Sequence, residues 1–360
     1  NNTLQQNMYI ELRGKILNIK DIIVLKNELL EKRIIDEYKY KDYIINNLSI
    51  KILKKIRKFH PEFPIKKEEL NQEKILKIIE YLKNLDYKKY IDQEKNIINS
   101  TNTHLCGIVK RHFDNFYDCK RKNVPSLKEM YYSDKDMIQS ILYRCGINNS
   151  RLYEYKINNS IIKTNETFDI SVKEIINGLI VKQKSLSFYY PATASIIYKL
   201  YLDGISEKIT IYDQSSGFGA RYLSSKAIND SFYIGNDPDL KTYKNLLEIK
   251  ENFQDEHSVF YNQMSEDLLL DQNINFSFTC PPYYDLEEYS YNISEKYISY
   301  ENWLNVHVRK TAENIFDKLN LYPQLCIIQV TEELKKDYIN IYKQKNVFEA
   351  AISAGYSLSD

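Results

Sequence analysis

Apolar residues in the second half of the 360-residue chain come in short continuous runs that stop at polar or turn residues. Runs of this kind are typical of strands buried on both faces of a sheet. Stretches with apolar residues at helical spacing lie between them, and this alternation predicts an α/β fold with a parallel sheet. The predicted strands are residues 209–213, 231–237, 258–261, 276–280 and 324–330. The predicted helices are residues 172–182, 192–202, 220–229, 240–247, 300–319 and 333–354.

The first 100 residues show helical spacing without such runs. Residues 51–59 form a basic amphipathic stretch, which Pro61 and Pro64 end. We therefore predict two domains: a mostly helical region over residues 1–165 and an α/β domain over residues 166–360. The helical spacing is carried by Ile16, Ile19, Ile22, Ile23, Leu29 and Leu30, and again by Ile75, Leu76, Ile79 and Leu82.

Charge is divided unevenly between the two halves of the chain. The first 200 residues contain 36 Lys and Arg against 24 Asp and Glu, and the last 160 contain 14 against 25. Lys and Arg contacts to phosphates drive affinity for nucleic acid, so the basic half favours DNA as a partner, with RNA as a second possibility. The alternative is that two domains of opposite charge simply pack together. Basic and aromatic residues also alternate over residues 110–122, which fits either nucleic-acid contact or, by preference, an ordinary amphipathic helix.

The loop after the first predicted strand has the residues of a ligand site. Gly217 and Gly219 permit positive φ and let the backbone approach a ligand without a Cβ in the way. The helix that follows would point its positive end at the same place. Asp213 ends this strand, and Asp237 ends the next, where an α/β fold places a carboxylate for a ribose. Only nine glycines occur in the chain, so their clustering here indicates tight turns.

The fourth predicted strand ends in the turn Cys280-Pro281-Pro282-Tyr283. Two consecutive prolines cannot continue a central ladder, because neither has an N–H to donate. They would make a rigid turn beside the glycine loop, with an aromatic side chain held next to it.

These motifs together resemble those of the phage and mobile-element DNA methyltransferases that modify exocyclic amino groups. The resemblance spans roughly residues 103–355 and includes the segment from Ser187 to Tyr198, which is similar to the family's entry into the cofactor-binding helix. It implies S-adenosylmethionine as cofactor and N6-methyladenine or N4-methylcytosine as product. The commonest family residue at position 280 is Asp, Asn or Ser, and some phage members carry Cys there, as this chain does.

The resemblance also implies roles for individual residues. The side chain at 280 and the carbonyl of Pro281 would accept the two N–H groups of an extruded base, against which Tyr283 would stack. A thiol is a weak acceptor, so we expect a slow enzyme. The catalytic set is Cys280, Pro281, Pro282 and Tyr283. The cofactor-binding set is Phe188, Pro191, Asp213, Ser216, Gly217, Gly219, Asp237 and Glu266, with Glu266 near the adenine.

Two alternatives remain open at this point: a methyltransferase acting on RNA or on a protein glutamine, and a catalytically inactive nucleic-acid-binding remnant. The family fold would continue with two more strands after residue 360, which predicts a shortened or degenerate chain. The sequence does not indicate the oligomeric state.

Composition excludes several other classes of protein. No stretch of eighteen apolar residues occurs, so we expect no membrane span. No signal-peptide pattern is present, and an odd number of cysteines, five, without a C-x-x-C pair fits a reducing cytoplasm. The resemblance to phage enzymes implies a bacterial host cell. The spacing of Cys106, His112, Cys119 and Cys145 matches no standard zinc finger, so no metal site is predicted.

Overall fold

The computed structural model divides the chain into two compact units. One combines Asn1–Lys66 with Asn123–Ser185, and the other combines Lys67–Lys122 with Leu186–Asp360. The described residues are 17–18, 50–92, 97–98, 104–144, 169–170, 175–176, 178–180, 188–228, 230–284, 286–289, 293–330 and 332–343.

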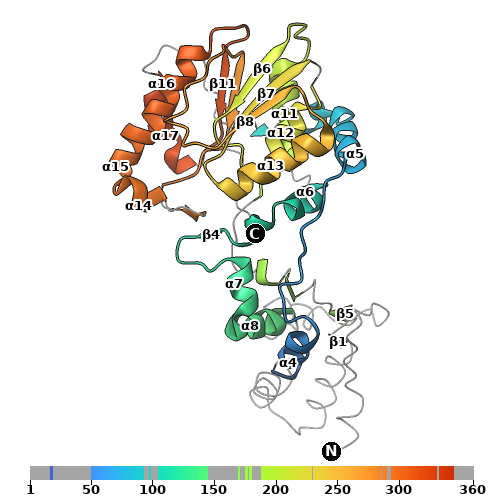
Figure 1. Cartoon of the computed structure of the whole chain (residues 1–360). Helices are drawn as coiled ribbons and strands as arrows, with labels where there is room; N and C mark the ends of the chain where they lie inside the picture. The colour runs from blue at the N-terminus through green and yellow to red at the C-terminus, as the bar shows by residue number, and fades with distance from the viewer. Residues whose placement is uncertain are drawn as a thin grey trace, which may run out of the picture. The chain divides into compact units, whose positions relative to one another are not determined.

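A five-stranded parallel sheet forms the centre of the second unit, in the order β11–β9–β6–β7–β8 (Figure 1). The first strand of the sheet, β6, is central, and β7 and β8 follow on one side of it. β9 and β11 then lie on the other side, so the strand order reverses between β6 and β9. The predicted α/β fold is confirmed, with all five strands where the apolar runs indicated. Their bounds are β6 Ile209–Asp213, β7 Ser231–Asn236, β8 Ser258–Tyr261, β9 Phe276–Thr279 and β11 Leu325–Ile328.

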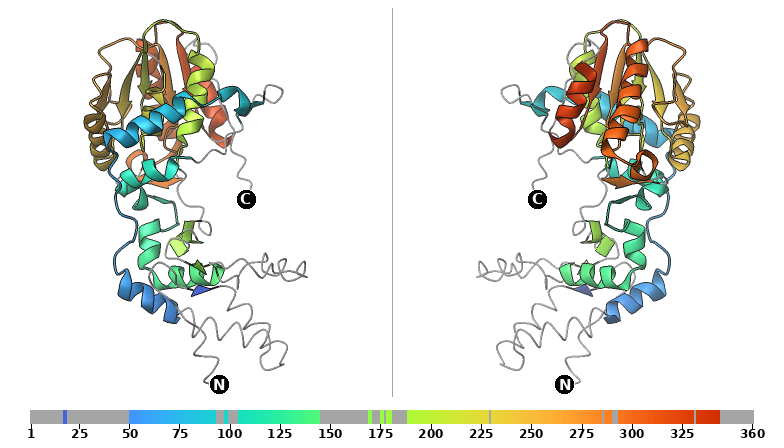
Figure 2. Two further views of the ribbon diagram at one scale, coloured as in Figure 1. Left: turned by 90° about the vertical axis from the view of Figure 1, so that its right-hand side faces the viewer. Right: turned by 90° about the vertical axis from the view of Figure 1, so that its left-hand side faces the viewer.

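Helices cover both faces of this sheet. The rings of Tyr198 in α11 and Tyr222 in α12 pack against Phe276 and Phe260, respectively, on one face. The helices that cover this face are α11 Pro191–Leu202, α12 Ala220–Ser225 and α13 Leu240–Phe253. On the other face, α16 Arg309–Lys318 and α17 Glu332–Lys343 lie in front of the sheet in the right-hand view of Figure 2.

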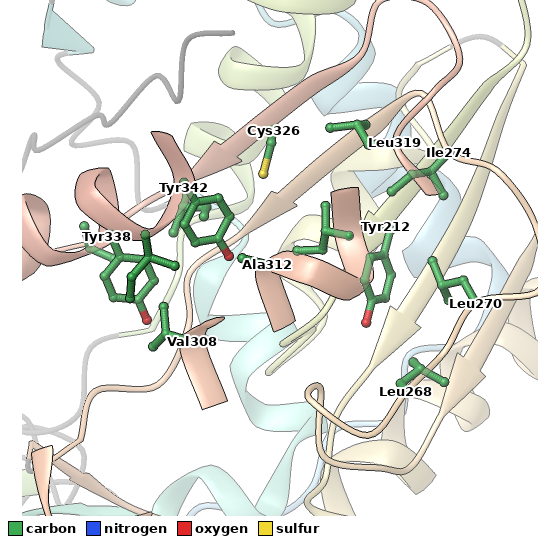
Figure 3. Packing of buried hydrophobic residues seen from close by; sticks show 14 of the residues in the cluster. Tyr212, Leu268, Leu270, Ile274, Val308, Ala312, Leu319, Cys326, Tyr338 and Tyr342 are labelled. Atoms are coloured by element: carbon green, nitrogen blue, oxygen red, sulfur yellow. The ribbon is translucent and has the colours of Figure 1, made fainter. Parts of the chain in front are cut away.

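The core on the α16 and α17 side is rich in tyrosine. Tyr212 of β6 and Cys326 of β11 meet Ala312 of α16 and Tyr338 and Tyr342 of α17, and all five are buried (Figure 3). Strands buried on both faces explain the continuous apolar runs in the sequence.

Several predicted helices have different bounds in the structure. The helix predicted over 220–229 ends at Ser225, and the one predicted over 300–319 is interrupted by a π-helical turn. The last helix ends at Lys343 among the described residues, and the rest of its predicted range lies outside them. The same holds for Ile16, Ile19, Ile22, Ile23, Leu29 and Leu30 of the first predicted helical spacing. The interrupted helix consists of α15 Tyr300–Trp303, η4 Leu304–Val308 and α16. It is preceded by α14 Ile293–Tyr297.

Residues 67–122, which the sequence predicts in the helical region, pack within the unit that holds the sheet. The Nζ atom of Lys199 in α11 donates to the carbonyl oxygens of Leu82, Lys83 and Leu85 at 2.7–2.8 Å, which satisfies the C-terminal end of α5. The elements of this segment are α5 Gln72–Lys83, η2 Tyr87–Tyr90, β2 Ile91–Asp92, β3 Ile97–Ile98, α6 Cys106–His112, η3 Asp114–Tyr117 and β4 Lys120–Arg121.

Among its described residues, the first unit contains helices and one short strand pair, β1 with β5. The predicted helix over 51–59 is confirmed as α4, and its Arg57 lies 3.1 Å from Asp134. The division into a DNA-binding region and a catalytic domain remains a prediction. The described elements are β1 Leu17–Asn18, α4 Ile50–Phe59, α7 Leu127–Tyr132, α8 Asp134–Arg144 and β5 Asp169–Ile170. None of the helices found in the described part of the chain is both long and apolar enough to span a membrane.

Candidate active site

The two motifs singled out in the sequence lie side by side at the carboxyl edge of the sheet. β6 and β9 are hydrogen-bonded neighbours, so the glycine loop (residues 214–219) and the Pro-Pro turn (residues 280–283) leave adjacent strands. The hydroxyl of Thr279 donates to Oδ1 of Asp213 at 3.0 Å, which joins the last residues of the two strands. This is the point where the strand order reverses, and open α/β sheets bind ligands there.

Asp213 is fully buried and already surrounded by donors. Oδ2 accepts from Arg221 Nε and from the Tyr233 hydroxyl, both at 2.7 Å, and Oδ1 accepts from the backbone N–H of Ser215 at 3.2 Å. Arg221 also donates to the carbonyl oxygen of Ser215. Asp213 therefore holds the glycine loop and the Pro-Pro turn together, and its predicted cofactor contact remains a prediction.

Gly217 has room beside its Cα atom for a ligand. Its φ is +55°, and a Cβ built on it would come no closer than 3.8 Å to another atom, the carbonyl oxygen of Ser215. Its N–H donates to Oδ2 of Asp237 at 2.9 Å. The neighbouring Ser216 is buried, and its N–H donates to the carbonyl of Asn236 at 2.8 Å. The loop is thus tied to the end of β7 and stays open at Gly217.

Gly219 has a different environment. With φ +73°, it precedes α12, and a Cβ on it would lie 3.0 Å from the ring of Phe113. Phe218 packs edge-on against Phe113 and Phe116, with centroids 5.7 and 5.0 Å apart, and is roughly parallel to Phe188 at 6.4 Å. The small size of Gly219 therefore serves packing against these aromatic rings.

Asp237 lies at the end of β7, beside the glycine loop. Oδ1 accepts from the N–H of Asp239 at 2.9 Å, and Oδ2 accepts from Gly217. Burial raises the pKa of Asp237 to about 7, although these two N–H groups lower it. A carboxylate at this edge, fixed by two backbone donors, suits the hydroxyls of a ribose.

Glu266 is held in a buried polar cluster. One oxygen accepts from Lys296 at 2.9 Å and from the hydroxyl of Tyr297, and the other lies 2.9 Å from Nδ1 of His307. Burial raises the pKa of Glu266, but the hydrogen bonds with His307 and Tyr297 outweigh it, so the pKa lies well below its usual value. Both oxygens already have partners, so this side chain fixes the loop after β8; its predicted place near the adenine remains a prediction.

The Pro-Pro turn brings Cys280 and Tyr283 together. Tyr283 is hydrogen-bonded to the Cys280 thiol, and burial raises the pKa of Cys280 to about 11, partly offset by the nearby Arg221. The thiol is therefore neutral near pH 7. Pro281 is buried and Pro282 is partly exposed, as expected for a rigid turn at the end of a central strand.

The segment before α11 approaches the same edge. Pro191 is the first residue of α11, and its carbonyl accepts from the Ser224 hydroxyl of α12 at 2.7 Å. Tyr189 donates to Oε1 of Gln329, directly after β11, and the Arg221 guanidinium lies 5.0 Å from the centroid of the Tyr189 ring. The sequence motifs do not predict a role for Arg221 or Gln329. The position of Arg221 two residues after the second glycine of the loop was the available signal.

The sequence motifs do not predict that residues 106–122, here called the strap, contact the glycine loop and the segment after the Pro-Pro turn. Besides the contacts of Phe113 and Phe116, β4 of the strap pairs with β10 (Glu287–Glu288), and Lys122 N–H donates to the carbonyl of Leu286 at 3.0 Å. The strap therefore runs from the glycine loop to the segment after the Pro-Pro turn.

No group of three or more His, Cys, Asp or Glu side chains that could hold a metal occurs among the residues that the structure describes. Cys106, Cys119, Cys280 and Cys326 are free thiols, and Cys145 lies outside the described residues.

No protein-family model matches the sequence, and no curated protein matches it. Among solved structures, a candidate RNA methyltransferase from Pyrococcus horikoshii matches at 14% identity and TM-score 0.30, over 43% of this chain and 65% of that protein. A candidate class I S-adenosylmethionine-dependent methyltransferase from Listeria monocytogenes matches at 14% identity and TM-score 0.34, over 76% and 79% of the two chains. A type I restriction-modification methyltransferase subunit from Streptococcus thermophilus matches at 14% identity and TM-score 0.22, over 74% and 63%.

The chain spans less than two thirds of the Pyrococcus and Streptococcus proteins. Identities and TM-scores are low in all three comparisons, so the functional assignment rests on the strand order and the residues of this chain.

Proposed function

We propose that this protein is an S-adenosylmethionine-dependent methyltransferase that modifies the exocyclic amine of adenine or cytosine in DNA. The observation that carries the proposal is the placement of the glycine loop and the Pro-Pro turn on neighbouring strands, joined by the Thr279–Asp213 hydrogen bond. A methyl donor and an amine must approach in line for such a transfer, and two loops at one sheet edge can hold both.

The residues present fit the cofactor. Gly217 leaves the loop open to a ligand, and Asp237 presents a fixed carboxylate next to it for ribose hydroxyls. When bound, S-adenosylmethionine supplies a methyl group whose bond to sulfur breaks as a bond to the amine nitrogen forms, and the nitrogen then gives up a proton. Phe188 and Pro191 stand at the entry to α11, on the side proposed for the methionine end.

The Pro-Pro turn would orient the target amine. The carbonyl of Pro281 and the side chain of Cys280 accept its two N–H groups, which turns the nitrogen lone pair toward the methyl carbon. The neutral Cys280 thiol is a weak acceptor, and it is already hydrogen-bonded to Tyr283. Both facts favour a slow reaction, with the proton leaving to solvent because no strong base is among the turn residues.

DNA is proposed as the substrate because the first 200 residues carry a clear excess of Lys and Arg. A flipped-out base would bring its amine to the sheet edge. The charge excess supports nucleic acid over a protein glutamine, and DNA is preferred over RNA on the resemblance of the motifs.

The proposal is tested by incubating the purified protein with methylation-free DNA and labelled S-adenosylmethionine. The DNA is then digested to nucleosides, which are identified by mass spectrometry. We expect N6-methyladenine or N4-methylcytosine. RNA is assayed in parallel, and label on RNA alone would contradict the proposed substrate. Cofactor binding with no transfer to DNA, RNA or protein would contradict the enzyme assignment.

A further inference from the structure

The middle of the strap is connected to the proposed ribose carboxylate by buried hydrogen bonds. Asn115, in η3, is 3% exposed, and its Nδ2 donates to Oδ1 of Asp239 at 3.2 Å and to the hydroxyl of Thr242 at 2.7 Å. The N–H of Asp239 in turn donates to Oδ1 of Asp237 at 2.9 Å. In this series of hydrogen bonds, only Asp239 lies between the amide of Asn115 and the carboxylate of Asp237.

Asp239 has two tasks in this chain of contacts. Its side chain caps α13, with Oδ1 accepting from the N–H of Thr242 at 2.8 Å, while its backbone N–H faces Asp237. Asn115 donates to the same Oδ1 atom and so fixes the capping side chain from the strap side. Movement of that side chain would turn the backbone N–H away from Asp237.

Asn115 is itself held firmly in place. Its Oδ1 accepts from Nδ2 of Asn245 at 3.2 Å, and Nε2 of His112, in α6, lies 3.1 Å from the carbonyl of Asn245. α6 and α13 also lie close together in Figure 1. The amide thus has partners on both of its ends, and its orientation is determined by the fold.

We propose that Asn115 is a positioning residue for the cofactor's ribose, acting through Asp239 on the carboxylate of Asp237; this inference rests on the proposed cofactor. Loss of the amide frees the Asp239 side chain, and the Asp237 carboxylate loses one of its two backbone donors. The carboxylate then no longer presents its oxygens in a fixed direction to the ribose hydroxyls. Contacts to the adenine and methionine parts of the cofactor are left intact.

A role in folding alone would produce a different result, and the two are separated by ligand choice. S-adenosylhomocysteine and its 2′,3′-dideoxy analogue are titrated calorimetrically into the wild-type protein and the Asn115→Ala variant. We expect the variant to bind S-adenosylhomocysteine about tenfold more weakly, the worth of one hydrogen bond. The dideoxy analogue lacks the ribose hydroxyls, so the variant should bind it as the wild type does.

Two further variants complete the test. Asn275→Ala removes another buried amide, at the opposite edge of the sheet, where Asn275 accepts from the N–H of Thr210 at 2.8 Å. It should lower stability and leave the affinities for both ligands unchanged. Asn115→Asp keeps the shape of the side chain and replaces the donor with an acceptor against Asp239. It should lose affinity for S-adenosylhomocysteine and keep its affinity for the dideoxy analogue, and it serves as the test variant where Asn115→Ala does not fold.

Equal weakening of both ligands by the Asn115 variants, or no weakening of either, would overturn the inference and leave the cofactor assignment standing. Failure of the wild-type protein to bind S-adenosylhomocysteine would overturn both.

Discussion

Arg221 and Asp213 form a buried ion pair, with Nε 2.7 Å from Oδ2 and side chains that are 4% and 0% exposed. The guanidinium also donates to the carbonyl of Ser215 and lies 5.0 Å from the ring centroid of Tyr189. The pair therefore connects the glycine loop, the segment before α11 and, through Thr279, the Pro-Pro turn. A site built from loops on three elements is held together by charges that no solvent screens.

Breaking this pair should be costly. Arg221→Met leaves the Asp213 carboxylate buried without its cation, and we expect a loss of about 3–5 kcal/mol in the free energy of unfolding, measured with urea. The double variant Arg221→Met with Asp213→Asn removes both charges and should recover part of that loss. A change below about 1 kcal/mol in the single variant would show that the pair carries little of the fold's stability.

Replacement of Cys280 should change the rate of methyl transfer in both directions. Cys280→Ala removes one acceptor for the target amine and should slow the reaction about tenfold, the equivalent of one neutral hydrogen bond. Cys280→Asn supplies a stronger amide acceptor and should exceed the wild-type rate. Both are measured as single-turnover transfer to DNA, with S-adenosylhomocysteine affinity as the control, which should not change. Equal rates in all three proteins would remove residue 280 from the mechanism.

Cofactor affinity should depend on pH through Asp237. Because burial raises its pKa to about 7, the carboxyl group takes up a proton as the pH falls through that value, and a protonated group is a poorer acceptor for ribose hydroxyls. We expect the affinity for S-adenosylhomocysteine to fall by up to about tenfold per pH unit below pH 7. The Asp237→Asn variant should show a flat profile. The charged groups that act on Asp237 include the carboxylates of Asp239 and Asp213.

The raised pKa of Asp237 also makes the free energy of unfolding depend on pH. The unfolded chain loses the Asp237 proton near its ordinary value of 3.8, whereas the folded protein keeps it until about pH 7. Unfolding therefore releases a proton between these values, and this group lowers the free energy of unfolding as the pH rises through that window. Urea denaturation of the wild type and Asp237→Asn at several pH values isolates the contribution. A wild-type curve parallel to that of the variant would contradict the raised pKa.

The two glycines of the loop should respond differently to a methyl group. Both have positive φ, so alanine costs about 1–2 kcal/mol of strain at either position. Gly219→Ala adds a 3.0 Å contact with Phe113 and should therefore destabilise the protein more, as seen in thermal unfolding. Gly217→Ala makes only an ordinary 3.8 Å contact with the carbonyl oxygen of Ser215, so its additional effect should be weaker binding of S-adenosylhomocysteine. Unchanged binding by Gly217→Ala would mean that the ligand does not lie against this residue.

The fold could be predicted from the sequence because strands buried on both faces leave continuous apolar runs. Leu325 to Ile328 is such a run, and its last three residues are buried. Phe276 to Thr279 is also buried throughout, although Ser277 and Thr279 interrupt its apolar residues. Helix bounds were less predictable. The apolar spacing of residues 300–319 continues through the π-helical turn at Leu304–Val308, which changes the local hydrogen bonding and leaves the helical pattern of side chains nearly unaltered.

The site was only partly predictable for a related reason. The glycine and Pro-Pro motifs are local signals, and strand order alone brings them together. The burial of Phe113 and Phe116 could be anticipated from their spacing, but their partner Phe218 lies about one hundred residues later, and no periodicity encodes such a pairing. The occupied oxygens of Asp213 and Glu266 were equally hidden, because their donors come from other strands and helices.

The strap has a consequence for how the protein is made. Asn115 and its partner Thr242 are 127 positions apart in the chain, and the hydrogen bond from Lys122 to Leu286 is also between distant residues. On the ribosome, the aromatic rings of the strap emerge long before the strands they will cover. The strap can make these contacts only after residues 242 and 286 have been synthesised. Contacts between residues this far apart in the chain slow folding, so the strap adds to the time that this unit needs to reach its final structure.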